Sequence, residues 1–327
     1  MSDTSAIRLD DLSKTYRVPV REPGLAAALK SIVRRQHREV EAVKQISYEV
    51  AAGEIVGFLG PNGAGKTTAL KMLSGLLNPT AGEVRVLGHE PFRRDRDFLR
   101  QITLVMGNRN QLVWDIPVSD SFERNRAIYR LPQEEFRRTV DGLAELLDLG
   151  DLLDKPVRNL SLGERMKCEI AAALLHRPKI LFLDEPTIGL DVTMQRRLRR
   201  FIKEYNKRYE ATVLLTSHYM ADVEALCHRV VVIHHGQLLF DGNLSSLVER
   251  FSPHKTVALD LEQEGMDLSA YGEVVSTDGS RVTLLVRKEE AARITGQLLA
   301  DLPVIDLTVE EPSIEEVIEQ VFAQEVE

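Results

Sequence analysis

One eight-residue segment, GPNGAGKT at residues 60–67, constrains the fold of this chain more than any other. It fits the pattern G-x-x-x-x-G-K-[ST], whose glycines let the backbone wrap phosphate groups and turn its N–H groups toward them. A buried-strand pattern at residues 54–59 precedes it and a helical pattern at 67–76 follows, which is the context that the loop requires. The sequence therefore predicts an α/β fold with a largely parallel sheet and a nucleotide site at this loop.

The side chains of the loop predict how it holds ATP. Lys66 is expected to act catalytically by reaching the β- and γ-phosphates, and the Thr67 hydroxyl is expected to ligate Mg²⁺. The further candidates for nucleotide binding are Gly60, Asn62, Gly63, Gly65 and Thr68.

A second segment supplies the carboxylates that such a site needs. The apolar run at residues 180–183 ends in Asp184 and Glu185, as a central parallel strand would. We expect Asp184 to bind the metal ion and Glu185 to act as the base toward the attacking water. Alone this pattern is weak, but paired with the loop it is strong.

Further motifs surround these two segments. Residues 160–163 read LSLG at a helix start, residues 188–191 read IGLD, residues 216–218 read TSH at a strand end, and residues 12–16 read LSKTY. With these motifs in register, the chain resembles the ATP-binding subunits of ABC transporters over about residues 6–242, most of all those of ABC-2-type exporters.

The resemblance implies roles for single residues. Tyr16 matches the aromatic residue that stacks on adenine, and His218 matches the switch histidine of the catalytic site. Ser161 and Gly163 match the signature residues that contact the γ-phosphate. Asp191 matches the aspartate of the D-loop.

The resemblance also implies an assembly. Two cassettes pair head to tail, so that ATP is sandwiched between the loop of one and the signature of the other. Because the chain carries one set of motifs, it needs a second copy or a homologous cassette. Hydrolysis would drive substrate export through a separate membrane permease, with this chain peripheral at the cytoplasmic face of the membrane.

Two positions depart from the family pattern. Glu164 follows the signature where glutamine is usual. This puts an acid near an anionic site; the alternative is a simple variation at the surface. The Q-loop glutamine, which contacts Mg²⁺, is missing from its usual place: aligning residues 102–106 with the preceding strand puts Asn108 there, or with a small offset Gln111.

Charge predicts a domain boundary. The chain has 42 basic and 50 acidic residues, a net charge of −8, and residues 251–327 hold 5 of the basic and 17 of the acidic ones. We therefore predict an ABC ATPase domain at residues 1–242 and a small acidic α+β accessory domain at 243–327. Within the first, residues 108–176 form a helical subdomain that carries the signature.

A basic insertion is predicted at residues 18–40. Apolar side chains recur in it at helical spacing, and its excess of cations suits a position near anionic lipid headgroups; the alternative is a surface helix that covers the cassette's own edge. The resemblance also implies that the permease docks at residues 108–115, and Trp114 there is either a permease anchor or a filler of the local core. The apolar stripe of the insertion consists of Leu25, Leu29, Ile32 and Val33.

Other classes of protein fit less well. No apolar run approaches the roughly 18 residues of a membrane-spanning helix, the N-terminus lacks a secretory signal, and the only cysteines, Cys168 and Cys227, suit the core of a cytosolic protein. The acidic net charge argues against nucleic acid as a partner. The 94 positions from Thr67 to Ser161 leave no room for the coiled coil of repair ATPases. The alternative function is a non-transport ABC ATPase or a nucleotide-dependent regulator.

Overall fold

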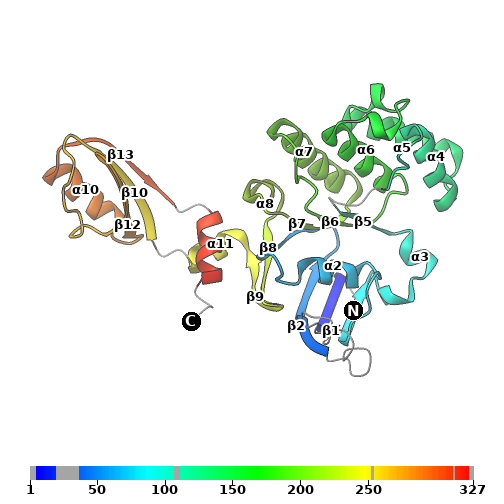
Figure 1. The fold of residues 1–327 in the computed structure, drawn as a ribbon, viewed down its shortest axis with the longest axis horizontal. Helices are drawn as coiled ribbons and strands as arrows, with labels where there is room; N and C mark the ends of the chain where they lie inside the picture. The colour runs from blue at the N-terminus through cyan, green and yellow to red at the C-terminus, as the bar shows by residue number, and fades with distance from the viewer. Residues whose placement is uncertain (1–4, 20–36, 107–110, 252–253, 312–313, 324–327) are drawn as a thin grey trace, which may run out of the picture. The chain divides into compact units, whose positions relative to one another are not determined.

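The structure, a computed structural model, describes residues 5–19, 37–106, 111–251, 254–311 and 314–323. The chain divides into two units, residues 1–242 and residues 243–327. Over the described residues the strands form three sheets, two in the first unit and one in the second (Figure 1).

A six-stranded sheet in the order β5-β6-β7-β3-β8-β9 forms the centre of the first unit, counted over the described residues. The first five of these strands run parallel. Every residue of β6 and β7 is buried, because helices or a second sheet cover such strands on both faces. The carboxyl ends of parallel strands lie at the same edge of a sheet. The last residues of β3, β6 and β7 therefore lie at one edge; they are Leu59, Asp184 and Thr216. The strands are β3 (Ile55–Leu59), β5 (Ile102–Met106), β6 (Ile180–Asp184), β7 (Thr212–Thr216), β8 (Arg229–His234) and β9 (Gln237–Asn243).

A three-stranded antiparallel sheet in the order β2-β1-β4 lies beside it, with β1 (Ser5–Pro19), β2 (His37–Ala51) and β4 (Ala81–Val86). This sheet corrects the limits of the predicted insertion. Val18 pairs with Arg38, so both ends of residues 18–40 belong to strands, where the ladder satisfies the backbone hydrogen bonds of each. The predicted stripe from Leu25 to Val33 lies outside the described residues.

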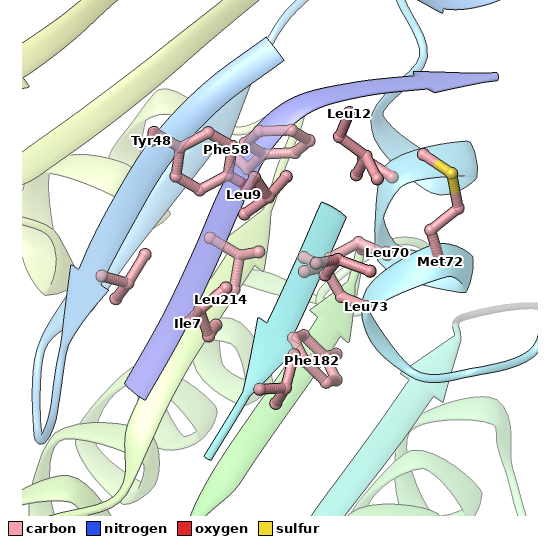
Figure 2. Packing of buried hydrophobic residues seen from close by; sticks show 14 of the residues in the cluster. Ile7, Leu9, Leu12, Tyr48, Phe58, Leu70, Met72, Leu73, Phe182 and Leu214 are labelled. Atoms are coloured by element: carbon pink, nitrogen blue, oxygen red, sulfur yellow. The ribbon is translucent and has the colours of Figure 1, made fainter. Parts of the chain in front are cut away.

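The main hydrophobic core fills the space between these two sheets and the helix α2 (Lys66–Leu73) (Figure 2). Phe58 of β3 and Phe182 of β6 are fully buried in it, together with Leu70 of α2. The ring centroids of Phe58 and Tyr48 lie 5.9 Å apart, a tilted contact between the two sheets. The loop at residues 60–67 therefore starts and ends on elements that this core holds in place.

Most of the remaining helices of the first unit lie together on one side of β5, β6 and β7 (Figure 1). Within residues 108–176 lie α4, α5 and α6, of which α6 packs against β5, α4 and α5. The helix α7 follows the turn after β6, and α8 follows the turn after β7. In order, the helices of this unit that follow α2 are α3 (Arg96–Leu99), α4 (Val118–Tyr129), α5 (Gln133–Leu147), α6 (Leu162–Leu174), α7 (Val192–Tyr209) and α8 (Met220–Leu226).

The second unit is α+β. Its antiparallel sheet has the order β11-β12-β10-β13, and α10 packs against β12 and β13 over a separate apolar cluster. The strand β11 was not predicted because its adjacent valines, Val274 and Val275, break the alternation typical of a half-buried strand. The elements are α9 (Leu244–Phe251), β10 (His254–Leu261), β11 (Glu273–Asp278), β12 (Arg281–Arg287), α10 (Ala291–Asp301), β13 (Val304–Glu310) and α11 (Ile314–Ala323).

The two cysteines agree with the prediction that they are core residues. Cys168 and Cys227 are free and buried, and burial raises the pKa of each thiol to about 12, so both are inert core residues. Searched over its described residues, the chain contains no helix with the length and apolar character needed to span a membrane.

A half-buried histidine, His176, predicts how stability depends on pH. The ring of His176 stacks on Tyr129 with centroids 3.9 Å apart, and burial lowers the pKa of its imidazole from 6.5 to about 4. The unfolded chain therefore takes up this proton at higher pH than the folded chain. As pH falls through this window, from about 6.5 toward 4, the free energy of unfolding should drop by about 2 kcal/mol on account of His176. Urea unfolding across this range, compared with His176→Phe, checks it: equal pH slopes for the two proteins would contradict the assignment.

Candidate functional site

Lys66 begins α2 and lies along the loop that precedes it. Its Nζ donates hydrogen bonds to the carbonyl oxygens of Gly60 at 2.5 Å and Pro61 at 3.1 Å. Burial lowers the pKa of its ammonium group, and the nearby carboxylates of Glu185 and Asp184 oppose that shift. A cation held at the loop, beside the helix N-terminus, is suited to bind phosphate oxygens.

Two glycines allow the loop to pass close to neighbouring backbone. Gly65 has a φ of 107°, and a Cβ on it would lie 2.3 Å from the carbonyl oxygen of Ala42 in β2. A Cβ on Gly60 would lie 2.2 Å from the carbonyl oxygen of Ile233 in β8. Glycine is therefore required at both positions. The other loop candidates lie at the exposed tip and in the first turn of α2: Asn62, Gly63 and Thr68.

The loop and the end of β6 meet through two side chains. The Thr67 Oγ1 donates to the Asp184 Oδ2 at 3.0 Å, while the Thr216 Oγ1 at the end of β7 donates to the Asp184 Oδ1 at 2.7 Å. Both oxygens of the carboxylate are thus held by hydroxyl groups from different elements. Two of the residues predicted to bind Mg²⁺, Thr67 and Asp184, thus lie in direct contact.

Glu185 and His218 also meet at this edge of the sheet. The Glu185 Oε1 lies 2.8 Å from the Nε2 of His218. Glu185 has a φ of 54°, a left-handed conformation that costs a residue other than glycine about 1–3 kcal/mol. Its N–H is held by the carbonyl and hydroxyl oxygens of Thr216, both at 3.1 Å. The backbone is therefore turned so that the carboxylate of Glu185 faces His218 beside Asp184.

The donor atoms at this site fit a magnesium ion bound together with a nucleotide. A hydroxyl and a carboxylate are the oxygen ligands that Mg²⁺ accepts, and the ion usually completes its shell with phosphate oxygens and water. Within the described residues no three His, Cys, Asp or Glu side chains gather into a metal site. Thr67 and Asp184 would hold Mg²⁺ only as part of a nucleotide complex.

Tyr16 lies on the strand pair that supports the loop. Lys14 of β1 pairs with Val43 of β2, and Val43 Cγ2 lies 3.3 Å from where a Gly65 Cβ would be. Tyr16 is two residues further along β1, half-buried, with the Lys14 Nζ 5.5 Å from its ring centroid. The adenine-stacking candidate thus lies on β1, the strand paired with β2, and β2 contacts the loop.

The signature segment begins α6 with a capping box. The Ser161 Oγ accepts from the N–H of Glu164 at 3.3 Å, and the Glu164 Oε2 accepts from the N–H of Ser161 at 2.8 Å. Hydrogen bonds from the backbone and the side chain of Ser161 to the Glu164 carboxylate lower the pKa of that carboxyl group. The glutamate is therefore a helix-capping residue that stabilises the signature turn, a role that glutamine can also fill.

The signature contacts the segment that carries Asp191. A Cβ on Gly163 would lie 3.7 Å from the Met194 Cε, and the Asp191 carboxylate caps α7 by accepting from the Met194 N–H at 2.9 Å. A Cβ on Gly189 would lie 2.9 Å from a methyl group of Leu162. The structure thus brings the signature to the D-loop candidate, while Lys66, Asp184 and Glu185 gather separately at the phosphate-binding loop.

Comparison with known proteins decides the family. Residues 43–188 match the protein family described as "ABC transporter". The ABC transporter ATP-binding protein NatA of Bacillus subtilis is 36% identical over 210 residues, which cover 64% of this chain and 85% of NatA. The chain belongs to the ATP-binding subunits of ABC transporters. It is accordingly an ATP-binding protein and an ATPase, as its motifs predict.

Two further likenesses extend over more of this ABC subunit. The Nod factor export ATP-binding protein I of Burkholderia thailandensis is 36% identical over 217 residues, 66% of this chain and 71% of that protein. A solved ATP-binding subunit of an ABC transporter shares the fold with a TM-score of 0.62 at 24% identity, covering 76% of this chain and 93% of that one. Residues 253–310 match the family described as "EvrA-like ABC transporter, C-terminal domain".

One of the two candidates for the Q-loop residue of the ABC subunit lies within the described residues. Asn108 lies outside the described residues. Gln111 donates from its backbone N–H to the Glu169 Oε2 at 2.6 Å and from its side chain to the Leu104 carbonyl at 3.3 Å. The alternative in which Trp114 fills the local core is wrong, because 49% of it is exposed.

The sequence did not single out several residues that hold the site together. Thr216 bonds Asp184 and Glu185, but it was noted only as part of the TSH motif. Asp222 is completely buried and bonds Thr187 and Ser217 at 2.5 and 2.6 Å. The one available signal is its place four residues after His218, because an acid so close to a strand-end motif can fold back onto it.

Proposed function

We propose that this ABC subunit binds Mg²⁺-ATP at residues 60–67 and hydrolyses it within a head-to-tail pair of cassettes that drives export through a separate permease. The observation that carries the proposal is the convergence of Lys66, Thr67, Asp184, Glu185 and His218 at one sheet edge. Mg²⁺ would supply charge neutralisation on the β- and γ-phosphates. Glu185 would accept the proton of the attacking water, and His218 would orient that carboxylate.

The separation of the signature from this cluster supports a paired assembly. Ser161 and Leu162 are exposed at the start of α6, and over the described residues the Lys66 Nζ bonds the carbonyls of its own loop, whereas Ser161 bonds Glu164. A second copy, or a homologous cassette, turned head to tail would supply Ser161 and Gly163 to the γ-phosphate. Such a pair contains two equivalent composite sites.

Export is favoured by the name of a relative: the protein from Burkholderia thailandensis is called a Nod factor export ATP-binding protein. The experiment that tests hydrolysis and pairing is Glu185→Gln, which is argued in the Discussion. Transport is tested by reconstituting the subunit with the membrane protein that co-purifies with it. We place the subunit at the cytoplasmic face of the membrane, held there by that permease.

A groove between the sheet and the helical subdomain is the proposed permease contact. It has a volume of about 730 Å³ and is lined by residues of β5, α3 and the end of α4. Ile128 and Leu76, which both line it, are 64% and 50% exposed, so the groove offers apolar surface to a partner. Its charged lining residues are the arginines Arg94, Arg96, Arg100 and Arg130 and the single acid Asp97.

This charge predicts an acidic, partly apolar cytoplasmic segment on the permease. We expect Arg96→Glu combined with Arg100→Glu to lower recovery of the permease with the tagged subunit by about tenfold, because like charges then face each other. ATP hydrolysis by the subunit alone should stay within about twofold of wild type, since both arginines lie outside the ATP site. The measurement is co-purification from native membranes at equal subunit amounts.

The matched control is reversal of two exposed arginines outside the groove, Arg137→Glu combined with Arg138→Glu on α5. It changes net charge equally and should leave recovery unchanged. Equal loss of recovery in the two double variants would place the permease contact elsewhere.

A further inference from the structure

A buried polar network lies directly behind the site, centred on Asp222 of α8. The Asp222 Oδ2 accepts from the Thr187 Oγ1 at 2.5 Å and from the Ser217 Oγ at 2.6 Å. The Asp222 Oδ1 accepts from the Arg199 Nε of α7 at 2.5 Å. Asp222 is 0% exposed, and Thr187 and Ser217 are 2% and 5% exposed, so no bulk water competes for these bonds.

The three partners come from three segments that each carry a site residue. Thr187 lies two residues after Glu185, and Ser217 directly precedes His218. Arg199 continues the network through a 3.3 Å bond to the Gln195 Oε1. Gln195 in turn donates to the carbonyl of Leu190, next to Asp191, at 3.1 Å.

We propose that Asp222 is a positioning residue that couples the turn after Glu185, the turn that carries His218 and the segment before Asp191. This inference rests on the proposed function, because it assigns Asp222 to the same hydrolytic step. A carboxylate can accept several hydrogen bonds at once, whereas an amide offers one acceptor oxygen. Only an acid at this position can accept from Thr187, Ser217 and Arg199 together.

The geometry beside the network explains why such coupling matters for rate. Glu185, Thr187, Ser217 and His218 line one small cavity of about 150 Å³. The 2.8 Å contact between Glu185 and His218 spans the two turns, so it depends on how the turns sit relative to each other. Misplacement of a reacting group by about 1 Å can cost about a hundredfold in rate. Asp222 acts on the reaction through this placement and does not itself touch ATP.

The test is Asp222→Asn in the full chain. The kcat for ATP hydrolysis should fall by about a hundredfold, while the affinity for Mg²⁺-ATP, titrated directly, should stay within about threefold of wild type. A merely structural role would lower the fraction of folded protein and leave the kcat per folded molecule unchanged. The measured ATPase activity is therefore divided by the fraction of folded protein at the temperature of the assay.

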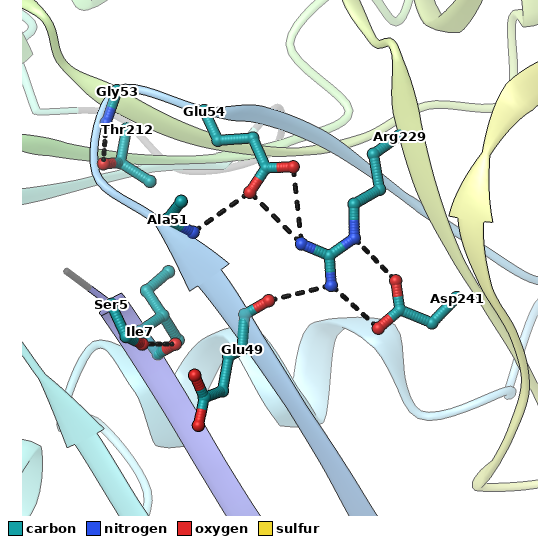
Figure 3. A network of polar contacts seen from close by, with 9 residues as sticks. All are labelled: Ser5, Ile7, Glu49, Ala51, Gly53, Glu54, Thr212, Arg229 and Asp241. Carbon is teal, nitrogen blue, oxygen red and sulfur yellow. Dashed lines mark hydrogen bonds and ion pairs between the residues drawn. The ribbon is translucent and has the colours of Figure 1, made fainter. Parts of the chain in front are cut away.

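A second arginine–carboxylate pair at the opposite end of the sheet provides a matched control (Figure 3). Arg229 at the start of β8 bonds Asp241 at 2.7 and 2.8 Å and Glu54 at 3.2 Å. Asp241→Asn breaks the same kind of pair far from the ATP edge of β3, and it should change stability without changing kcat. A fall in kcat of equal size in Asp222→Asn and Asp241→Asn would overturn the proposal, as would an unchanged kcat in Asp222→Asn.

A double-mutant cycle separates coupling from general damage. Thr187→Val and Ser217→Ala each remove one partner, and each should lower kcat by about tenfold on its own. Added to Asp222→Asn, either change should have little further effect, because its bond is already lost. Independent, multiplying losses would overturn the coupling. If wild type and Glu185→Gln hydrolyse ATP equally, the proposed function itself fails. This outcome is distinct from the results with Asp222, Thr187 and Ser217 that would overturn the coupling alone.

Discussion

Glu185→Gln should lower the rate of ATP hydrolysis by about a thousandfold, because an amide cannot accept a proton from the attacking water. The substitution keeps the size of the side chain and one acceptor oxygen for the contact with His218 at 2.8 Å. It leaves Lys66, Thr67 and Asp184 in place, so ATP binding should remain. The expected species is an ATP-bound pair of chains that does not turn over.

The measurement combines steady-state hydrolysis with light scattering in the presence of Mg²⁺-ATP. Wild type should form the pair transiently, and Glu185→Gln should hold it. Glu224→Gln on α8 is a suitable control, because Glu224 is an exposed acid outside the described contacts of the site. A variant with near wild-type turnover would remove Glu185 from the role of base.

Lys66→Ala should weaken ATP binding itself by about a hundredfold, because it removes a charge-assisted bond to the phosphates. The side chain is buried against the loop, and its Nζ contacts the Gly60 carbonyl at 2.5 Å. Isothermal titration with Mg²⁺-ATP at a concentration where the chain is monomeric measures the loss directly.

Ser161→Arg should have the opposite effect: the monomer should bind ATP with unchanged affinity, but ATP should no longer drive pairing of two chains. Since Ser161 also caps α6, a second variant is needed that leaves the capping box intact. Gly163→Arg meets this condition, because a Cβ there makes only ordinary contacts with Met194. Equal loss of ATP affinity in Lys66→Ala, Ser161→Arg and Gly163→Arg would contradict a site composed of two chains.

The sequence alone determined the local parts of this protein. The loop at residues 60–67, the strand that delivers Asp184 and Glu185, and the order of the surrounding motifs are local patterns, because residue type and spacing specify them within about ten positions. The α/β fold with a helical subdomain and a C-terminal domain is confirmed. The predicted limits of the insertion at residues 18–40 are wrong, because both of its ends belong to the long strands β1 and β2. Pairing between distant segments decides where a strand ends.

Only the tertiary structure decided how these parts hold one another. The two hydroxyls on Asp184, the turned backbone of Glu185 and the capping role of Glu164 each join groups whose meeting no single pattern predicts. Asp222 is the clearest case, since its partners lie 5, 23 and 35 positions away along the chain. Hydrogen bonds between such groups form only once the sheet and the helices are packed, because burial and direction, not residue type, select their partners.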